Sequence, residues 1–134
     1  VKEDGLDKLS EIFFNYGKSS PDISDEIAEK YKNAPYRAPM IIILVNSFKE
    51  HPKVPAIEQK LSTATAAQNI MLALNAMKYS CIWRTGKLAF NKSIQKSIGL
   101  NENQEIIGFI YVGTETGKKK QIPTLDIDEF VAYL

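Results

Sequence analysis

The chain has 134 residues, of which 44% are apolar and 25% charged, and this size and composition predict one domain with a real core rather than a disordered or fibrous protein. Its 17 basic and 16 acidic residues leave a formal net charge of +1, so no bulk field would attract nucleic acid or an anionic membrane as a partner. The longest apolar run, Met40 to Val45, is too short to span a bilayer, and Cys81 is the only cysteine, so a reducing, cytoplasmic setting without an internal disulfide is expected.

Two helices are predicted before the first long apolar run. Lys2 to Gly5 is typical of a strand end that turns into a helix, and Asp4 is expected to cap that helix. Gly17 suits the position just after its end. A second helix is predicted to start at Asp22 or Ser24. The apolar residues that recur at helical spacing in these two segments are Leu6, Leu9, Phe13, Tyr16, Ile23, Ile27 and Tyr31.

The middle of the chain predicts a buried strand followed by a long helix. Met40 to Val45 is continuously apolar and rich in β-branched residues, which is typical of a strand buried on both faces at the centre of its sheet. The segment from Ile57 to about Lys78 has helical character and no charge between Lys60 and Lys78. A surface helix would carry a charged stripe, so this helix is expected to be buried nearly all round. In so small a chain, a second subunit is the simplest cover for its outer side.

Two more strands and a short helix are predicted downstream. Cys81 to Thr85 reads as a short strand that ends at Gly86, and Asn91 is expected to cap a short helix that closes at Gly99. Glu105 to Gly113 is a mostly apolar strand with a glycine at its centre. Such a glycine indicates a bulge or a close approach by another group.

The ends of the chain raise two further expectations. The tail from Ile122 to Leu134 is too apolar for a free, solvated segment, whereas Lys118 to Lys120 reads as a solvated loop because no aromatic residues are interleaved with its lysines. The chain opens at Val1 without a methionine. An element is therefore expected upstream, with a cloning boundary or a disordered N-terminus as the alternative.

Four ordered segments resemble one protein family. They are NAPYRAPMIII at Asn33 to Ile43, KVPAIEQ at Lys53 to Gln59, IWRTGKL at Ile82 to Leu88 and EIIGFIYVGT at Glu105 to Thr114. No Gly-rich dinucleotide fingerprint and no P-loop occurs. In order and spacing the segments are similar to the compact bacterial NAD(P)H nitroreductases of the flavin nitroreductase family, and the likeness covers nearly the whole chain.

The resemblance implies an α+β fold, with a mixed, mainly antiparallel sheet flanked by helices and a long central helix at a dimer interface. Residues 1–134 would then form a single nitroreductase-like domain that lacks the N-terminal helices of the family. Family members are homodimers that hold FMN between the subunits. NAD(P)H reduces the flavin, and a nitroaromatic, quinone or similar small-molecule acceptor reoxidises it in ping-pong fashion.

The resemblance also assigns site residues. Trp83, Arg84, Thr85 and Gly86 match the segment that lies against FMN in the family. The residues that match the nicotinamide nucleotide contact at the end of the long helix are Ala73, Leu74, Asn75, Ala76, Met77 and Lys78. No catalytic residue and no metal ligand is assigned.

Two departures from the family pattern accompany these assignments. The Arg-Arg-Ser-type element that grips the FMN phosphate has no match in this sequence, and Lys78, Ser80 and Cys81 stand where the family often has glycines. Outside the family context, Trp83 would be read as a core residue and Arg84 as a surface ion-pair partner. Two other functions stay open: a non-catalytic dimerisation or interaction module, and a flavin enzyme with another reaction, such as reductive dehalogenation or flavin breakdown.

Overall fold

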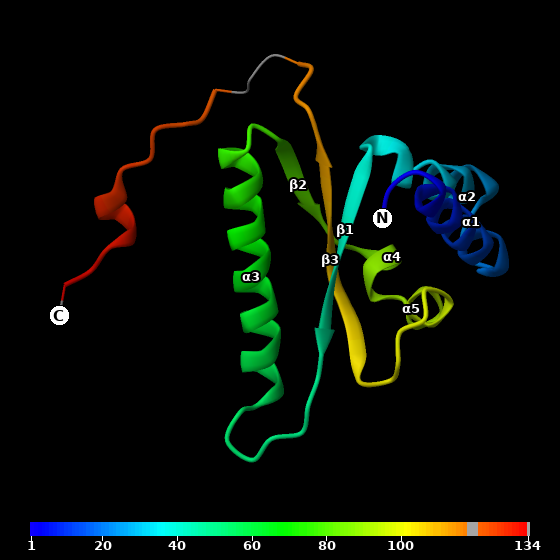
Figure 1. Cartoon of the computed structure of the whole chain (residues 1–134), viewed down its shortest axis with the longest axis horizontal. Helices are drawn as coiled ribbons and strands as arrows, with labels where there is room; N and C mark the ends of the chain where they lie inside the picture. The colour runs from blue at the N-terminus through cyan, green and yellow to red at the C-terminus, as the bar shows by residue number, and fades with distance from the viewer. Residues whose placement is uncertain (118–120, 134) are drawn as a thin grey trace.

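The computed structural model describes residues 1–117 and 121–133 (Figure 1). The lysine loop at 118–120 and Leu134 lie outside the described residues. In chain order, the helices and strands are α1 (Asp4–Ser19), α2 (Asp25–Lys32), η1 (Pro35–Arg37), β1 (Met40–Ser47), α3 (Ala56–Ala76), β2 (Ser80–Arg84), α4 (Lys87–Phe90), α5 (Lys92–Ser97), β3 (Gln104–Gly113) and η2 (Ile127–Phe130).

The described strands form one antiparallel sheet with the order β1-β3-β2. Helix α3 lies along one face of this sheet, whereas α1, α4 and α5 lie on the other side with α2 beside α1 (Figure 1). Residues 121–133 lie on the side of α3 that faces away from the sheet (Figure 1). The sheet therefore separates two apolar layers of different composition.

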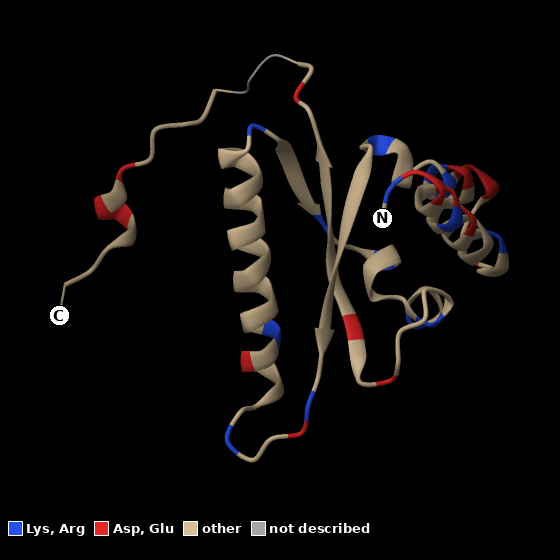
Figure 2. Ribbon diagram, viewed as in Figure 1, with Lys and Arg blue, Asp and Glu red and all other residues tan. Residues whose placement is uncertain are grey.

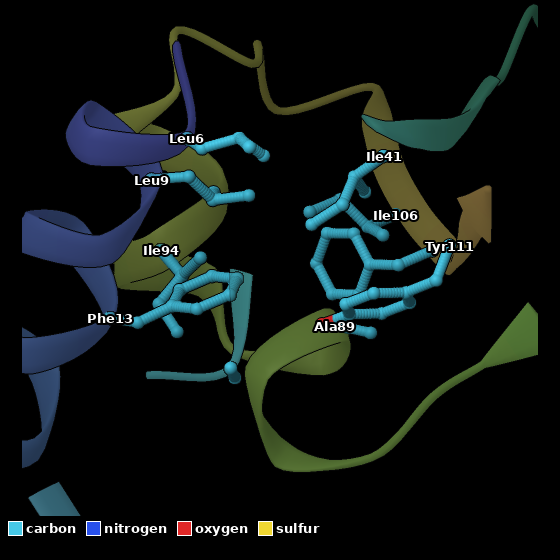
Figure 3. Packing of buried hydrophobic residues seen from close by; sticks show 10 residues of the cluster. Leu6, Leu9, Phe13, Ile41, Ala89, Ile94, Ile106 and Tyr111 are labelled. Atoms are coloured by element: carbon cyan, nitrogen blue, oxygen red, sulfur yellow. The ribbon is translucent and has the colours of Figure 1, made fainter. Parts of the chain in front are cut away.

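The larger of these layers lies between the sheet and α1, α4 and α5. Phe13 of α1 is fully buried and meets Phe109 of β3 edge to face, with ring centroids 5.7 Å apart. Leu6, Leu9 and Phe13 follow one face of α1, as helical spacing predicts, and Ile94 of α5 joins them (Figure 3). The smaller layer, between the sheet and α3, contains Leu44, Ala67, Leu74, Ile110 and Val112.

A bulge in β3 determines which side chains enter each layer. Leu44 pairs with Gly108 but Val45 pairs with Ile106, so Ile107 is an extra residue in β3. An extra residue reverses the alternation of side chains along a strand. For this reason Ile106 and Phe109, three positions apart, reach the same layer. Of the two alternatives expected at Gly108, a bulge is therefore present, at the residue before it.

Three expectations about element ends and position are wrong. Asp4 does not cap α1 but is its first residue, after an N-cap Glu3 that makes no side-chain cap bond. Gly17 lies inside α1, and its glycine serves the packing of α2, since a Cβ there would come within 2.8 Å of Ala28. In the described sheet, β1 is an edge strand, and the central strand is β3, which is buried without interruption from Gly108 to Val112.

The other predicted elements are confirmed. Lys2 bridges to Met40 before the chain turns into α1, as a strand end would. The Ser24 side chain caps α2 by accepting a hydrogen bond from Ile27 N–H. The long helix, β2 and the capped helix α5 lie close to their expected bounds.

The outer face of α3 is exposed in the single chain, contrary to a helix buried all round. This face consists of Leu61, Thr65, Asn69, Leu72, Ala73 and Ala76, all exposed. After Lys60 the helix carries no charged residue, and Figure 2 shows its upper part free of Lys, Arg, Asp and Glu. No helix of the described chain is long and apolar enough to cross a membrane.

Asn91 offers a test of the local interactions that start α5. Its side-chain oxygen accepts hydrogen bonds from the N–H groups of Ser93, at 2.9 Å, and Ile94, at 3.2 Å. We expect Asn91→Ala to lower the free energy of unfolding by about 1 kcal/mol, because both N–H groups lose their acceptor. Urea unfolding measures this change. Asn91→Asp keeps an acceptor and serves as the control, so equal losses in the two variants would contradict the capping role.

Candidate functional site

The site residues predicted around FMN lie at the end of β2 and in the turn that follows it. Trp83 points to the α3 side of the sheet and packs with the smaller apolar layer. Its indole lies across Gly108, where an added Cβ would fall 1.9 Å from Nε1. The indole nitrogen is buried and has no hydrogen-bond partner in the described chain. The close approach predicted at Gly108 is thus confirmed, and the Trp83 side chain belongs to the protein's own packing.

Arg84 points to the opposite side of the sheet. Its guanidinium carbon lies 5.9 Å from the centroid of the Tyr111 ring, which is a cation–π distance. Burial raises the pKa of the Tyr111 hydroxyl, while the positive charges of Arg37 and Arg84 act to lower it. Both arginines of the chain therefore lie near one buried phenol.

The turn after β2 is exposed and contains a glycine with a positive φ, a backbone conformation that other residues rarely adopt. Gly86 has a φ of +110°, and nothing lies within 4 Å of the position that a Cβ would occupy. Its carbonyl accepts hydrogen bonds from Ala89 and Phe90 N–H at the start of α4. Thr85 and Gly86 are both exposed. A glycine in this conformation allows backbone to come close to a flat ligand.

One pocket opens beside this turn, and a second lies at the start of β2; Arg37 lines both. The first, here called the α2–α4 pocket, has a volume of about 330 Å³. Its lining includes Lys30, Tyr31, Arg37, Thr85, Lys87 and Leu88. The second, with a volume of about 300 Å³, lies at the edge of β2 between Arg37, Ile82 and Tyr111. Of the four predicted flavin residues, Thr85 lines a pocket directly.

The predicted nucleotide residues lie elsewhere in the subunit. Ala73 to Ala76 form the last turn of α3, Met77 is its C-cap and Lys78 adopts a φ of +67°. All are exposed except Leu74, which packs in the smaller layer. This segment precedes the first residue of β2, and the predicted flavin segment contains its last two residues. Within one chain, the two sets meet in the smaller apolar layer, where Leu74 and Trp83 pack in the same cluster.

Arg37, Lys30 and Lys87 were missed as site residues by sequence reasoning. Lys30 and Arg37 come from the consecutive elements α2 and η1, and only the fold brings Lys87 of the distant α4 to them. One signal was present: arginine is rare in this lysine-rich chain, and both copies lie in the family-like segments at 33–43 and 82–88.

The alkylation rate of Cys81 tests how far the fold shields β2. Burial raises the pKa of its thiol, and the thiolate is the form that reacts with alkylating agents. At any pH below the raised pKa, a smaller fraction of the thiol is ionised. We therefore expect iodoacetamide at about pH 8 to modify Cys81 more slowly in the folded chain than in the unfolded chain. Mass spectrometry with and without guanidinium chloride measures the two rates. Equal rates would show that β2 does not shield the thiol.

Comparisons with known proteins decide the family. A sequence model described as the nitroreductase family matches residues 2–114. The chain belongs to the nitroreductase family. The resemblance predicted from the sequence is therefore confirmed, and so is the α+β, nitroreductase-like fold.

Individual members of the nitroreductase family agree with this assignment. YdjA of Escherichia coli strain K12, whose name marks it as a candidate NAD(P)H nitroreductase, is 32% identical over 99% of this chain and 73% of its own length. A Haemophilus influenzae protein named in the same way is 30% identical over 100% of this chain and 73% of its own length.

Solved structures show the same fold. A nitroreductase-like family protein from Bacillus cereus superposes with a TM-score of 0.81 over 99% of this chain and 70% of its own, at 19% identity. The FMN-dependent nitroreductase NfnB from Mycobacterium smegmatis, solved with NADPH, gives a TM-score of 0.67 over 99% of this chain and 76% of its own, at 15% identity.

Proposed function

We propose that this nitroreductase-family chain is an FMN-dependent NAD(P)H oxidoreductase. The observation that carries the proposal is the family match over residues 2–114, which includes the Trp83 to Gly86 turn. The names of the curated relatives and of NfnB support the same cofactor pair. Bound FMN would supply the redox chemistry, by taking a hydride from NAD(P)H and passing two electrons to a nitroaromatic, quinone or similar acceptor in ping-pong order.

The residues at the end of β2 fit a flavin. Open space beside Gly86 leaves the backbone of Arg84, Thr85 and Gly86 free to approach a planar ring. Arg84 adds positive potential on the same side as Tyr111, which favours an electron-rich reduced ring. The packed Trp83 side chain would hold this strand end in place. Trp83 would thus support FMN binding through the backbone that it anchors.

We further infer a homodimer in which two copies meet through the outer face of α3. This face exposes Leu61 and Leu72, 57% and 59% exposed, without a charged residue between Lys60 and Lys78. The C-terminal segment, residues 121–133, is exposed throughout. It includes Ile122, Leu125, Ile127, Phe130, Val131 and Tyr133. Exposed apolar surface on this scale is typical of a protein–protein contact. A second copy would also carry the Ala73 to Lys78 segment, the proposed NAD(P) contact, into the interface.

Flavin binding and NAD(P)H oxidation test the function. We expect the purified chain to be yellow or to become yellow on addition of FMN, and to oxidise NADH or NADPH with a quinone as acceptor. Absorbance spectroscopy measures both. A chain that binds no FMN and oxidises neither nucleotide would contradict the proposal, and if dimeric it would instead act as a non-catalytic interaction module. A flavin-loaded chain that reduces neither quinones nor nitroaromatics would point to dehalogenation or flavin breakdown.

A further inference from the structure

The α2–α4 pocket concentrates positive charge in a chain that is close to neutral overall. Lys30, Arg37 and Lys87 line it from three separate elements, together with the hydroxyl-bearing Thr85. No Asp or Glu is among the described residues of its lining. Because the whole chain has a formal net charge of only +1, its composition alone does not account for three basic residues in one pocket.

Two of the pocket's three positive charges have no ion-pair partner in the described chain. Three lysines of α1 and α2 pair with carboxylates, in Lys18–Asp25, Lys32–Glu29 and, at the pocket itself, Lys30–Glu26. By contrast, the ion pairs of the described chain include neither arginine nor Lys87. Figure 2 shows the alternation of acidic and basic residues along α1 and α2. Two positive charges of the pocket, Arg37 and Lys87, thus lack a protein counter-charge.

The geometry suits an anion that is attached to an apolar body. Ile27 and Leu88 also line the pocket, so the basic groups face an apolar wall. Arginine binds phosphate through paired hydrogen bonds in one plane, and lysine adds a point charge. Arg37 also lines the neighbouring pocket beside Tyr111, which would allow a ligand to continue along β2.

We propose that the α2–α4 pocket binds a phosphate monoester, with Arg37 and Lys87 as its principal contacts. The proposal rests on the function proposed above, because FMN and NADPH each carry such a group. Thr85, at the end of the predicted flavin segment, would donate a hydroxyl hydrogen bond to the same phosphate.

Four ligands and three variants test the proposal by isothermal titration calorimetry. The ligand pairs are FMN with riboflavin and NADPH with NADH, which differ within each pair by one phosphate. The variants are Arg37→Gln, Lys87→Gln and, as a matched control, Lys53→Gln. Arg37, Lys87 and Lys53 are all exposed, so each change removes one positive charge without disturbing the core. Far-ultraviolet circular dichroism checks that each variant folds.

We expect Arg37→Gln and Lys87→Gln each to raise the dissociation constant of the phosphate-bearing ligand by about tenfold or more. The affinity for the phosphate-free ligand of the pair should not change. Lys53→Gln should bind all four ligands as the unaltered chain does. If only the affinity for FMN falls, the pocket binds the flavin phosphate. If only the affinity for NADPH falls, it binds the phosphate of the nicotinamide nucleotide. Unchanged affinity for both would overturn the proposal.

Inorganic phosphate separates this proposal from the oxidoreductase proposal. In a ¹⁵N-resolved nuclear magnetic resonance titration, phosphate should shift the amide signals of Thr85 and Lys87 in the unaltered chain and not in Arg37→Gln. If these shifts occur while FMN does not bind and NAD(P)H is not oxidised, the pocket stands and the oxidoreductase proposal fails. If they are absent and FMN binds equally well to all variants, the pocket proposal fails alone.

Discussion

Replacing Gly108 by alanine is expected to lower the free energy of unfolding by about 2–3 kcal/mol, at the upper end of the usual range for overpacking. The added Cβ would lie 1.9 Å from Trp83 Nε1 and 2.7 Å from its Cδ1, so the indole must move. It has little room, because Trp83 packs against the apolar layer under α3. Urea unfolding of the variant and the unaltered chain measures the loss.

Two further variants isolate the clash with Trp83. Gly117→Ala adds the same methyl group where nothing lies within 4 Å, and it should change stability by only a few tenths of a kcal/mol. In a Trp83→Leu background the smaller side chain leaves room, so Gly108→Ala should cost much less there than in the natural sequence. If the cost is the same in both backgrounds, contact with the indole is not its cause.

Glutamate at Leu72 or Ala73 is expected to dissociate the proposed homodimer. Both residues lie on the outer face of α3 and are exposed in the single chain, so the folded subunit tolerates the charge. A second copy packed on this face would bury the carboxylate without a partner, which costs several kcal/mol. We therefore expect the dimer dissociation constant to rise about 100-fold or more. Sedimentation equilibrium measures it.

Ser97→Glu is the matched control for the dimer test. Ser97 is exposed on α5, across the sheet from α3, and the change adds the same charge. This variant should keep the dissociation constant of the unaltered chain. Leu72→Glu and Ala73→Glu chains that remain dimeric would show that the copies meet elsewhere. Unaltered protein that is monomeric at high concentration would refute the dimer itself.

Much of the fold follows from local pattern. The spacing of Leu6, Leu9 and Phe13 predicts one buried face of a helix, and that face forms the larger apolar layer. Gly108 in an apolar strand predicts a bulge or a close contact, and both occur. These features are predictable because they depend on backbone geometry and on residues near in the chain.

The errors arose where distant segments decide the outcome. Gly17 has the sequence context of a helix end, yet it lies inside α1, where the absence of a side chain lets Ala28 of α2 pack against it. The apolar run at 40–45 reads as a central strand, but pairing order makes β3 central and β1 an edge in the described sheet. A strand's hydrophobicity reports burial, whereas its position in the sheet depends on which other strands pair with it.

By itself, the sequence determined the family and the segment proposed to face the flavin, because ordered motifs such as Ile82 to Leu88 can be read without coordinates. It also determined that α3 carries no charged residue after Lys60. Only the tertiary structure decided that one face of α3 stays open, that Trp83 packs across Gly108, and that Arg37 and Lys87 meet in one pocket. The physical reason is that these features depend on contacts between elements far apart in the chain, whose relative placement no local periodicity encodes.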